Sequence, residues 1–242
     1  MSISPILGID SEHLPARVLV VGDPERVSTV AKRLDSPETL GRNREYHSMV
    51  GRHRGERVAV VSHGVGSAGA GVCFEELCRA GVKRIIRVGS AGGLQAKVRA
   101  GDVVIARAAV REDGLSPKLV PLGYPAIADE DLVLSMRKNA SDLGIRSHEG
   151  VVLTSDLFYP GEALGSDLPL WHRAGVVAVE MEIATLYVVS ALHGVESAAV
   201  VAIDGNPLEQ DGGSMESYNP NQEAVREAVQ SSIEIGLTAL IS

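Results

Sequence analysis

The sequence predicts an α/β protein in which a central mixed, mostly parallel sheet is flanked by helices. Short runs of Val, Ile and Ala alternate with helix-like segments along the whole chain. The 242 residues, 45% of them hydrophobic and 22% charged, suffice for one soluble domain with a substantial core. No linker, repeat or low-complexity segment interrupts the pattern. We therefore expect residues 1–242 to form a single domain with three layers.

The elements follow from local signals. A strand is expected wherever a short apolar run stands between turn residues, and the runs cover residues 17–21, 57–62, 83–88, 102–110, 151–153, 176–179 and 197–203. Helices are expected where the spacing becomes helical, with Pro24 in the first turn of one and Gly144 closing another. The predicted helices cover residues 24–34, the segment up to about residue 80, 129–143, 181–193 and 222–241.

Composition excludes several classes of function. The formal net charge is −8, and no basic face suited to nucleic acid is present. Cys73 and Cys78 lie five residues apart in one predicted helix, and we interpret both as reduced packing residues. No His/Cys cluster suggests a metal site. The first ten residues resemble no signal peptide and no window is long enough to span a bilayer, so we expect a cytoplasmic protein without a membrane partner.

Two arginine-bearing turns are the most informative motifs. Gly22-Asp23-Pro24-Glu25-Arg26 and Arg87-Val88-Gly89-Ser90 each occur where an apolar run ends. A glycine there lets backbone N–H groups point outward, and the arginine adds a forked cation. Together the turns predict a pocket for a phosphate-sized dianion. The alternative is a pair of tight turns with solvated arginines.

Two familiar motifs fit poorly. Residues 64–69 read GVGSAG, a literal GxGxxG, but a dinucleotide-binding fold needs an acidic residue about 20 positions later, where this chain has Arg87. Ser90 lies in VGSAGG, and a nucleophile elbow would need glycine at Val88. We therefore expect Ser90 to donate a hydrogen bond to an oxyanion rather than to attack a substrate.

Carboxylates follow two of the predicted strands. Glu180 and Glu182 flank Met181 and could accept hydrogen bonds from a vicinal diol such as ribose, or could merely favour a helix N-terminus. Asp204 begins a glycine-rich stretch, residues 204–221, that could be a binding loop or a surface excursion. Partial burial would raise the pKa of Asp204 and suit it to proton donation. The alternative is a turn-forming aspartate before Gly205.

Several motifs together resemble the hexameric nucleoside phosphorylase family over nearly the whole chain. They are VVGDPERV, NREY, VSHGVGSAGAGVCFEEL, IIRVGSAGGLQ, AAVRED, SDLFYPG, VEMEIATL and the strand ending in IDG. The likeness is greatest to compact purine nucleoside phosphorylases, with uridine phosphorylases as the near competitor. It implies that phosphate cleaves a purine nucleoside to free base and ribose 1-phosphate, with no cofactor. It also implies a homo-hexamer built as a trimer of dimers.

The same resemblance implies a role for each matching residue. Asp204 would be the general acid facing the purine, and Arg44 would reach the phosphate in a neighbouring subunit's site. The remaining roles are phosphate binding by Gly22, Arg26, Arg87 and Ser90, ribose binding by Glu180, Met181 and Glu182, and a nucleoside pocket lined by Val65, Val72, Tyr159 and Pro207.

The chain departs from the family pattern at two places. Ile6 occupies the position where the family usually lends a histidine to the ribose 5′-hydroxyl of a neighbour, so we expect 5′-modified purine nucleosides to be accepted. Glu162-Ala163-Leu164 replaces the Gln-x-Arg pair with which uridine phosphorylases grip uracil, which favours purines. Residues 110–131 nevertheless look like the uridine branch. A nucleosidase would not need the three arginines, and a nucleoside-binding protein would show no turnover.

Overall fold

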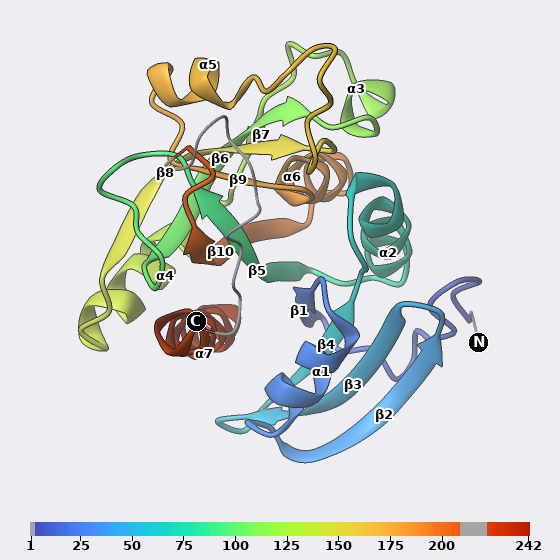
Figure 1. Ribbon diagram of the computed structural model, residues 1–242. Coiled ribbons are helices and arrows are strands. Elements are labelled where there is room, and N and C mark those ends of the chain that lie inside the picture. Colours follow the sequence, from blue (N-terminus) through green and yellow to red (C-terminus); the bar gives the residue numbers. More distant parts are fainter. Residues whose placement is uncertain (1–2, 209–221) are drawn as a thin grey trace.

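Four parallel strands form the centre of the molecule. The computed structural model describes residues 3–208 and 222–242. Strand β1 (Arg17–Val21) lies between β4 (Glu56–Ser62) and β5 (Arg84–Gly93), and β10 (Glu196–Gly205) pairs with the far side of β5. The carboxyl ends of these strands therefore meet at one edge of the sheet, where ligands bind in α/β folds. Figure 1 shows β5 beside β10 at the centre of the molecule.

The sheet closes on itself beyond β5. Strand β10 pairs antiparallel with β6 (Val103–Glu112), which runs parallel to β8 (Ser147–Ser155). Strand β8 is parallel to β9 (Ala178–Glu180), and β9 returns antiparallel to β5. Strands β5, β10, β6, β8 and β9 thus form a closed ring. The ring brings the residues that directly follow β9 next to the carboxyl ends of β5 and β10. The short β7 (Ala126–Ile127) adds to β6.

An antiparallel hairpin that the sequence analysis missed extends the other side of the sheet. It consists of β2 (Asp35–Asn43) and β3 (Tyr46–His53), and β3 pairs antiparallel with β4. The segment DSPETLGRN of β2 is polar and largely exposed, so no apolar alternation marks it. The sheet is mixed, as expected, and its parallel pairings lie at the centre and among β6, β8 and β9.

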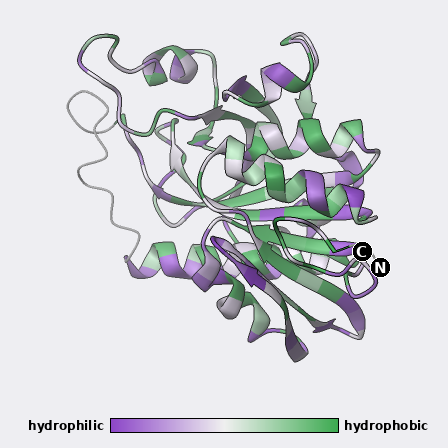
Figure 2. Cartoon of the chain, turned by 90° about the vertical axis from the view of Figure 1, so that its right-hand side faces the viewer, coloured by the Kyte–Doolittle hydropathy of each residue, from purple (hydrophilic) through white to green (hydrophobic). Residues whose placement is uncertain are grey.

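Helices cover both faces of the sheet, as expected for an α/β protein. Helices α2 (Ser67–Arg79) and α6 (Ile183–Leu192) pack on one face. Helices α1 (Pro24–Ala31), α4 (Glu130–Asp142) and α7 (Glu223–Leu240) pack on the other. Alternate residues of β1 enter the two cores, and all of its valines are fully buried, which explains the continuous apolar runs. Figure 2 shows the resulting hydrophobic interior.

Several element boundaries differ from the prediction. Strands β5 and β8 are longer than expected, because the glycine-rich end of β5 and the polar start of β8 are held by ladder hydrogen bonds. Two short helices, α3 (Ser116–Leu119) and α5 (Leu168–Arg173), were not predicted. Cys73 and Cys78 are both free and buried, as predicted. No helix among the described residues is long and apolar enough to cross a membrane.

Candidate active site

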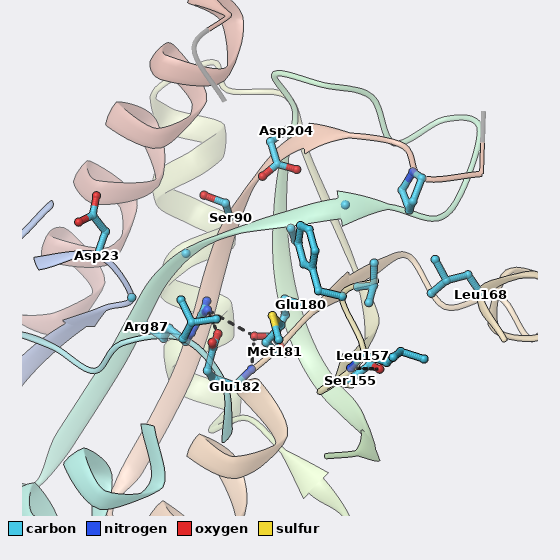
Figure 3. A pocket seen from close by; sticks show the side chains of 18 of the residues that line it. Asp23, Arg87, Ser90, Ser155, Leu157, Leu168, Glu180, Met181, Glu182 and Asp204 are labelled. Carbon is cyan, nitrogen blue, oxygen red and sulfur yellow. Dashed lines mark hydrogen bonds and ion pairs between the residues drawn. The ribbon is translucent and has the colours of Figure 1, made fainter. Parts of the chain in front are cut away.

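A cavity of about 290 Å³ opens at the carboxyl ends of β1, β5 and β10 (Figure 3). The junction between β9 and α6 forms its floor, and the segment after β8 and the start of α5 form a further wall. Its size suits a small organic ligand. It is lined by Gly22, Asp23, Arg26, Gly64, Val65, Arg87, Gly89, Ser90, Ala91, Gly92, Ser155, Leu157, Phe158, Pro160, Ser166, Asp167, Leu168, Val179, Glu180, Met181, Glu182, Asp204 and Pro207.

The two arginine-bearing turns converge on this cavity. Asp23 caps α1 by accepting a hydrogen bond from the Glu25 backbone N–H at 2.8 Å, which places Arg26 in the first turn of that helix. The Arg26 guanidinium donates through Nη2 to Ser90 Oγ at 3.2 Å. Ser90 lies on β5 beside Gly89. The hydrogen bond therefore joins Arg26 and Ser90, which are 64 positions apart in sequence, into one polar corner. This is the juxtaposition that an anion pocket requires.

Arg87 is a buried part of the cavity wall, which rules out the solvated-arginine interpretation for this residue. Its side chain is 4% exposed and forms an ion pair with Glu182, and its Nη2 atom lies 3.5 Å from Glu180 Oε2. The guanidinium folds back over Gly89, where an added Cβ would lie 1.8 Å from Arg87 Nη1. Glycine at position 89 is therefore what leaves room for the arginine.

The two glutamates have different structural roles. Glu180 caps α6: its carboxylate accepts hydrogen bonds from Thr154 Oγ1 at 2.6 Å, from the Glu182 N–H at 2.8 Å and from the Ile183 N–H at 3.0 Å. The helix-terminus interpretation is thus correct for Glu180. Glu182 instead pairs with Arg87 and accepts from the Gly66 N–H at 2.6 Å, so its carboxylate is held at the cavity wall.

The electrostatics of the pair differ as well. Burial raises the pKa of Glu180 to about 7, although Arg87 opposes this. Burial also acts to raise the pKa of Glu182, but the charge of Arg87, aided by the Gly66 hydrogen bond, holds that pKa below its ordinary value. Glu182 is therefore a carboxylate at neutral pH and can only accept hydrogen bonds.

Asp204 lies in a bulge of β10. The register with β5 shifts between Ile203 and Gly205, so Asp204 is an extra residue without a partner position in the ladder. A bulge re-aims a side chain, and here Asp204, which is 5% exposed, lines the cavity. Asp204 belongs to the strand rather than to a turn.

Comparison with known proteins shows the family of this chain. A family model described as "Phosphorylase superfamily" matches residues 16–242. This chain belongs to the phosphorylase superfamily. It is 42% identical to the purine nucleoside phosphorylase of Plasmodium falciparum over 212 residues, which cover 87% of this chain and 86% of that protein. It is 33% identical to the uridine phosphorylase of Haemophilus influenzae, covering 91% and 90% of the two chains. The crystal structure of purine nucleoside phosphorylase from Toxoplasma gondii in complex with immucillin-H superposes with a TM-score of 0.94 at 31% identity, covering 99% and 96%.

Most of the predicted site residues meet in this phosphorylase cavity. Those that line it are Gly22, Arg26, Val65, Arg87, Ser90, Glu180, Met181, Glu182, Asp204 and Pro207. Arg44, Val72 and Tyr159 are not part of its wall. Arg44 lies in the turn between β2 and β3, Val72 is exposed on α2, and the Tyr159 side chain is 78% exposed. Among the described residues of this one chain, two guanidinium groups rather than three reach the cavity, and the intersubunit role of Arg44 stays a prediction.

Sequence reasoning missed part of the wall of this phosphorylase site. Phe158, rather than Tyr159, lines the cavity, and the two rings pack edge to face with centroids 4.8 Å apart. No periodicity in the segment indicates which ring faces inward. Leu168 was missed too, although Asp167 followed by Leu168-Pro169 is a typical helix start. Residues 209–221, most of the predicted binding loop, lie outside the described residues.

Proposed function

We propose that this protein is a purine nucleoside phosphorylase, which reversibly converts a purine nucleoside and phosphate into the free base and ribose 1-phosphate. One observation carries the proposal: a single cavity combines the Arg26–Ser90 corner, the buried Arg87–Glu182 pair and the buried Asp204. Phosphorolysis needs cations that bind the phosphate anion, a carboxylate that binds the ribose diol and an acid that protonates the leaving base. The Plasmodium relative carries the same activity in its name.

The arginine corner would bind the nucleophile. A phosphate oxygen attacks C1′ of the ribose while the bond from C1′ to the base nitrogen breaks, and both bond electrons leave with the base. The sugar passes through an oxocarbenium-like state, which an adjacent phosphate dianion stabilises. Arg26, Arg87 and Ser90 would hold that anion without reorganisation, because Arg87 is already fixed by its carboxylate partners. Gly22 and Gly89 let the backbone approach the anion closely.

The carboxylates and the acid would serve the nucleoside. Glu182 is ionised and held from two sides, so it can accept hydrogen bonds from the ribose hydroxyls, with Met181 beside the sugar. Asp204 would donate a proton to nitrogen 7 of the purine as negative charge builds up on the base. Phe158 and Pro207 supply apolar surface for the base. Phosphate is a co-substrate, and the proposal requires no cofactor.

A uridine phosphorylase is the second candidate. The Haemophilus relative supports it, as does the Vibrio fischeri uridine phosphorylase structure, which superposes with a TM-score of 0.91 at 28% identity. The segment at the position expected to grip uracil argues against it: residues 162–164 are exposed, and none of them is among the described residues that line the cavity.

A substrate panel tests the proposal. Inosine, guanosine, adenosine and uridine are incubated with and without phosphate, and free base and ribose 1-phosphate are quantified. We expect phosphate-dependent release of purines and little release of uracil. Equal release without phosphate would indicate a nucleosidase, binding without release a nucleoside-binding protein, and preferential cleavage of uridine the second candidate.

The assembly and the 5′ preference belong to the same proposal. We expect a cytoplasmic homo-hexamer built from dimers, in which the exposed Arg44 completes the phosphate site of a neighbour. Ile6 packs against the apolar core with its side chain and donates its backbone N–H to Glu76 at 2.9 Å. An isoleucine offers no hydrogen bond to a 5′-hydroxyl, so 5′-methylthioinosine should have a kcat/KM at least comparable to that of inosine. A large preference for inosine would contradict this.

A further inference from the structure

We infer that Asp156 is a positioning residue that fixes the nucleoside-binding wall of the cavity, an inference that rests on the proposed function. Asp156 directly follows β8 and directly precedes Leu157 and Phe158, which line the cavity. Asp156 itself is not part of the wall. Its influence on a bound nucleoside must therefore act through its two neighbours.

The carboxylate of Asp156 joins three separate segments. Its Oδ1 accepts a hydrogen bond from Ser67 Oγ at 2.8 Å, at the start of α2. Its Oδ2 accepts from the Gly114 backbone N–H at 2.6 Å, in the loop after β6. The two donors are 89 and 42 residues away in sequence. We call these two hydrogen bonds the Asp156 clasp, because they hold the segment after β8 at two points. Hydrogen bonds to a carboxylate are stronger than hydrogen bonds between neutral groups.

The Ser67 side of the clasp reaches the ribose-binding carboxylate. Ser67 follows Gly66, and the Gly66 N–H donates to Glu182 Oε1 at 2.6 Å. A chain of contacts through Asp156, Ser67 and Gly66 thus connects the wall segment that contains Phe158 to the carboxylate of Glu182. The clasp therefore sets the spacing between the apolar wall and the carboxylate expected to bind the sugar.

The Gly114 side of the clasp is anchored to rigid structure. Asp113 accepts from the Ser116 N–H at 2.6 Å and from Thr185 Oγ1 at 3.1 Å, which links the loop to α6. Leu115 packs so closely on α2 that a Cβ at Gly71 would lie 2.1 Å from its Cδ2 atom. An alanine at Gly114 would bring its Cβ within 3.1 Å of Asp156 Oδ2. Both ends of the clasp are therefore attached to packed helices.

The wall segment needs such an anchor because little apolar burial holds it. Leu157 is 55% exposed and Phe158 is 38% exposed in this chain. A loop with few buried contacts opens at low cost unless polar bonds fix it. Without the clasp, Leu157 and Phe158 would sample positions that no longer fit the base, while the arginine corner would stay in place.

The experiment compares the KM values of the two substrates in single variants. Ser67→Ala removes one donor, and Asp156→Asn weakens both bonds. We expect each to raise the KM for inosine about tenfold while changing the KM for phosphate less than about twofold. Ser67→Thr keeps the hydroxyl and should restore the KM for inosine. The matched control is Asp142→Asn, which removes an exposed carboxylate on α4 that pairs with Lys138 at 2.6 Å.

The outcomes separate the inference from the proposed function. A wild-type protein that does not cleave purine nucleosides in the presence of phosphate contradicts the function itself. An active wild type whose Ser67→Ala variant keeps the KM for inosine, or raises both KM values alike, overturns the clasp. Should Asp156→Asn fail to fold, Ser67→Ala and Ser67→Thr decide the question, since alanine is a good helix former at that position.

Discussion

The two halves of the cavity are built differently. The anion half consists of Arg87 and Ser90, which lie on the central strand β5, and Arg26, which lies on the helix that follows β1. The nucleoside half consists largely of loop residues, such as Phe158 and Pro207, beside the bulge that carries Asp204. A frame of buried strands fixes the first half, and local hydrogen bonds fix the second. The groups proposed to hold phosphate are thus tied to the core, whereas the loop segments around the rest of the cavity can vary without disturbing it.

The largest expected effect tests the nucleoside half. Asp204→Asn keeps the shape of the side chain but removes the proton donor, so kcat for inosine should fall by about 100-fold or more, with the phosphate KM little changed. Steady-state kinetics measure this. The control substrate is 7-methylguanosine, whose base already carries a positive charge and leaves without protonation, so its kcat should fall far less. Full activity of the variant on inosine would remove Asp204 from the mechanism.

The next prediction asks whether the anion half is complete within one chain. Arg44→Ala should raise the phosphate KM about tenfold or more, because a charge-assisted hydrogen bond to the dianion is lost. Arg54→Ala is the matched control: Arg44 and Arg54 occupy successive hairpin turns with φ near 50°, and Arg54 pairs with Glu234 at 3.1 Å. An unchanged phosphate KM in Arg44→Ala would mean that Arg26 and Arg87 suffice.

The anion half was also the more predictable from sequence. The central strands are buried on both faces, so they read as unbroken apolar runs, and the glycines and arginines at their ends are local signals. The edge strand β2 carries no such pattern because it is polar and exposed. Whether Phe158 or Tyr159 faces the cavity depends on tertiary contacts, and sequence spacing alone could not decide it. The bulge at Asp204 depends on pairing with β5, which is equally invisible locally.

A glycine substitution tests how tightly the frame holds the anion half. Gly89→Ala places a methyl group where Arg87 Nη1 lies, so either the strand or the guanidinium must move. We expect a loss of about 1–3 kcal/mol in the free energy of unfolding, together with a raised phosphate KM. Urea unfolding and steady-state kinetics measure both. Gly123→Ala is the control, since nothing lies within 4 Å of its added Cβ. Unaltered unfolding and kinetics in Gly89→Ala would show that the arginine is free to relocate.

The smallest effect concerns two buried groups, His63 and Glu180, whose titrations change the free energy of unfolding in opposite directions. Burial and the charge of Arg87 lower the pKa of His63 from 6.5 to about 4, and its Nδ1 lies 2.8 Å from the Gly64 carbonyl oxygen. The unfolded chain therefore binds more protons than the folded one between about pH 4 and 6.5, so the stability that His63 contributes is lost as pH falls through this range. Burial raises the pKa of Glu180 from 4.5 to about 7, so its contribution is lost as pH rises through about 4.5 to 7.

Between about pH 4.5 and 6.5 the two slopes should nearly cancel in the wild-type protein. Glu180→Gln removes one of them, so the unfolding free energy should then gain up to about 1.4 kcal/mol for each added pH unit relative to wild type. Urea unfolding at fixed protein concentration between these pH values measures the difference. His63→Asn should change the slope in the opposite direction. If both variants keep the wild-type slope, the two groups do not titrate as a buried, opposing pair, and the base of the anion half is more hydrated than its burial indicates.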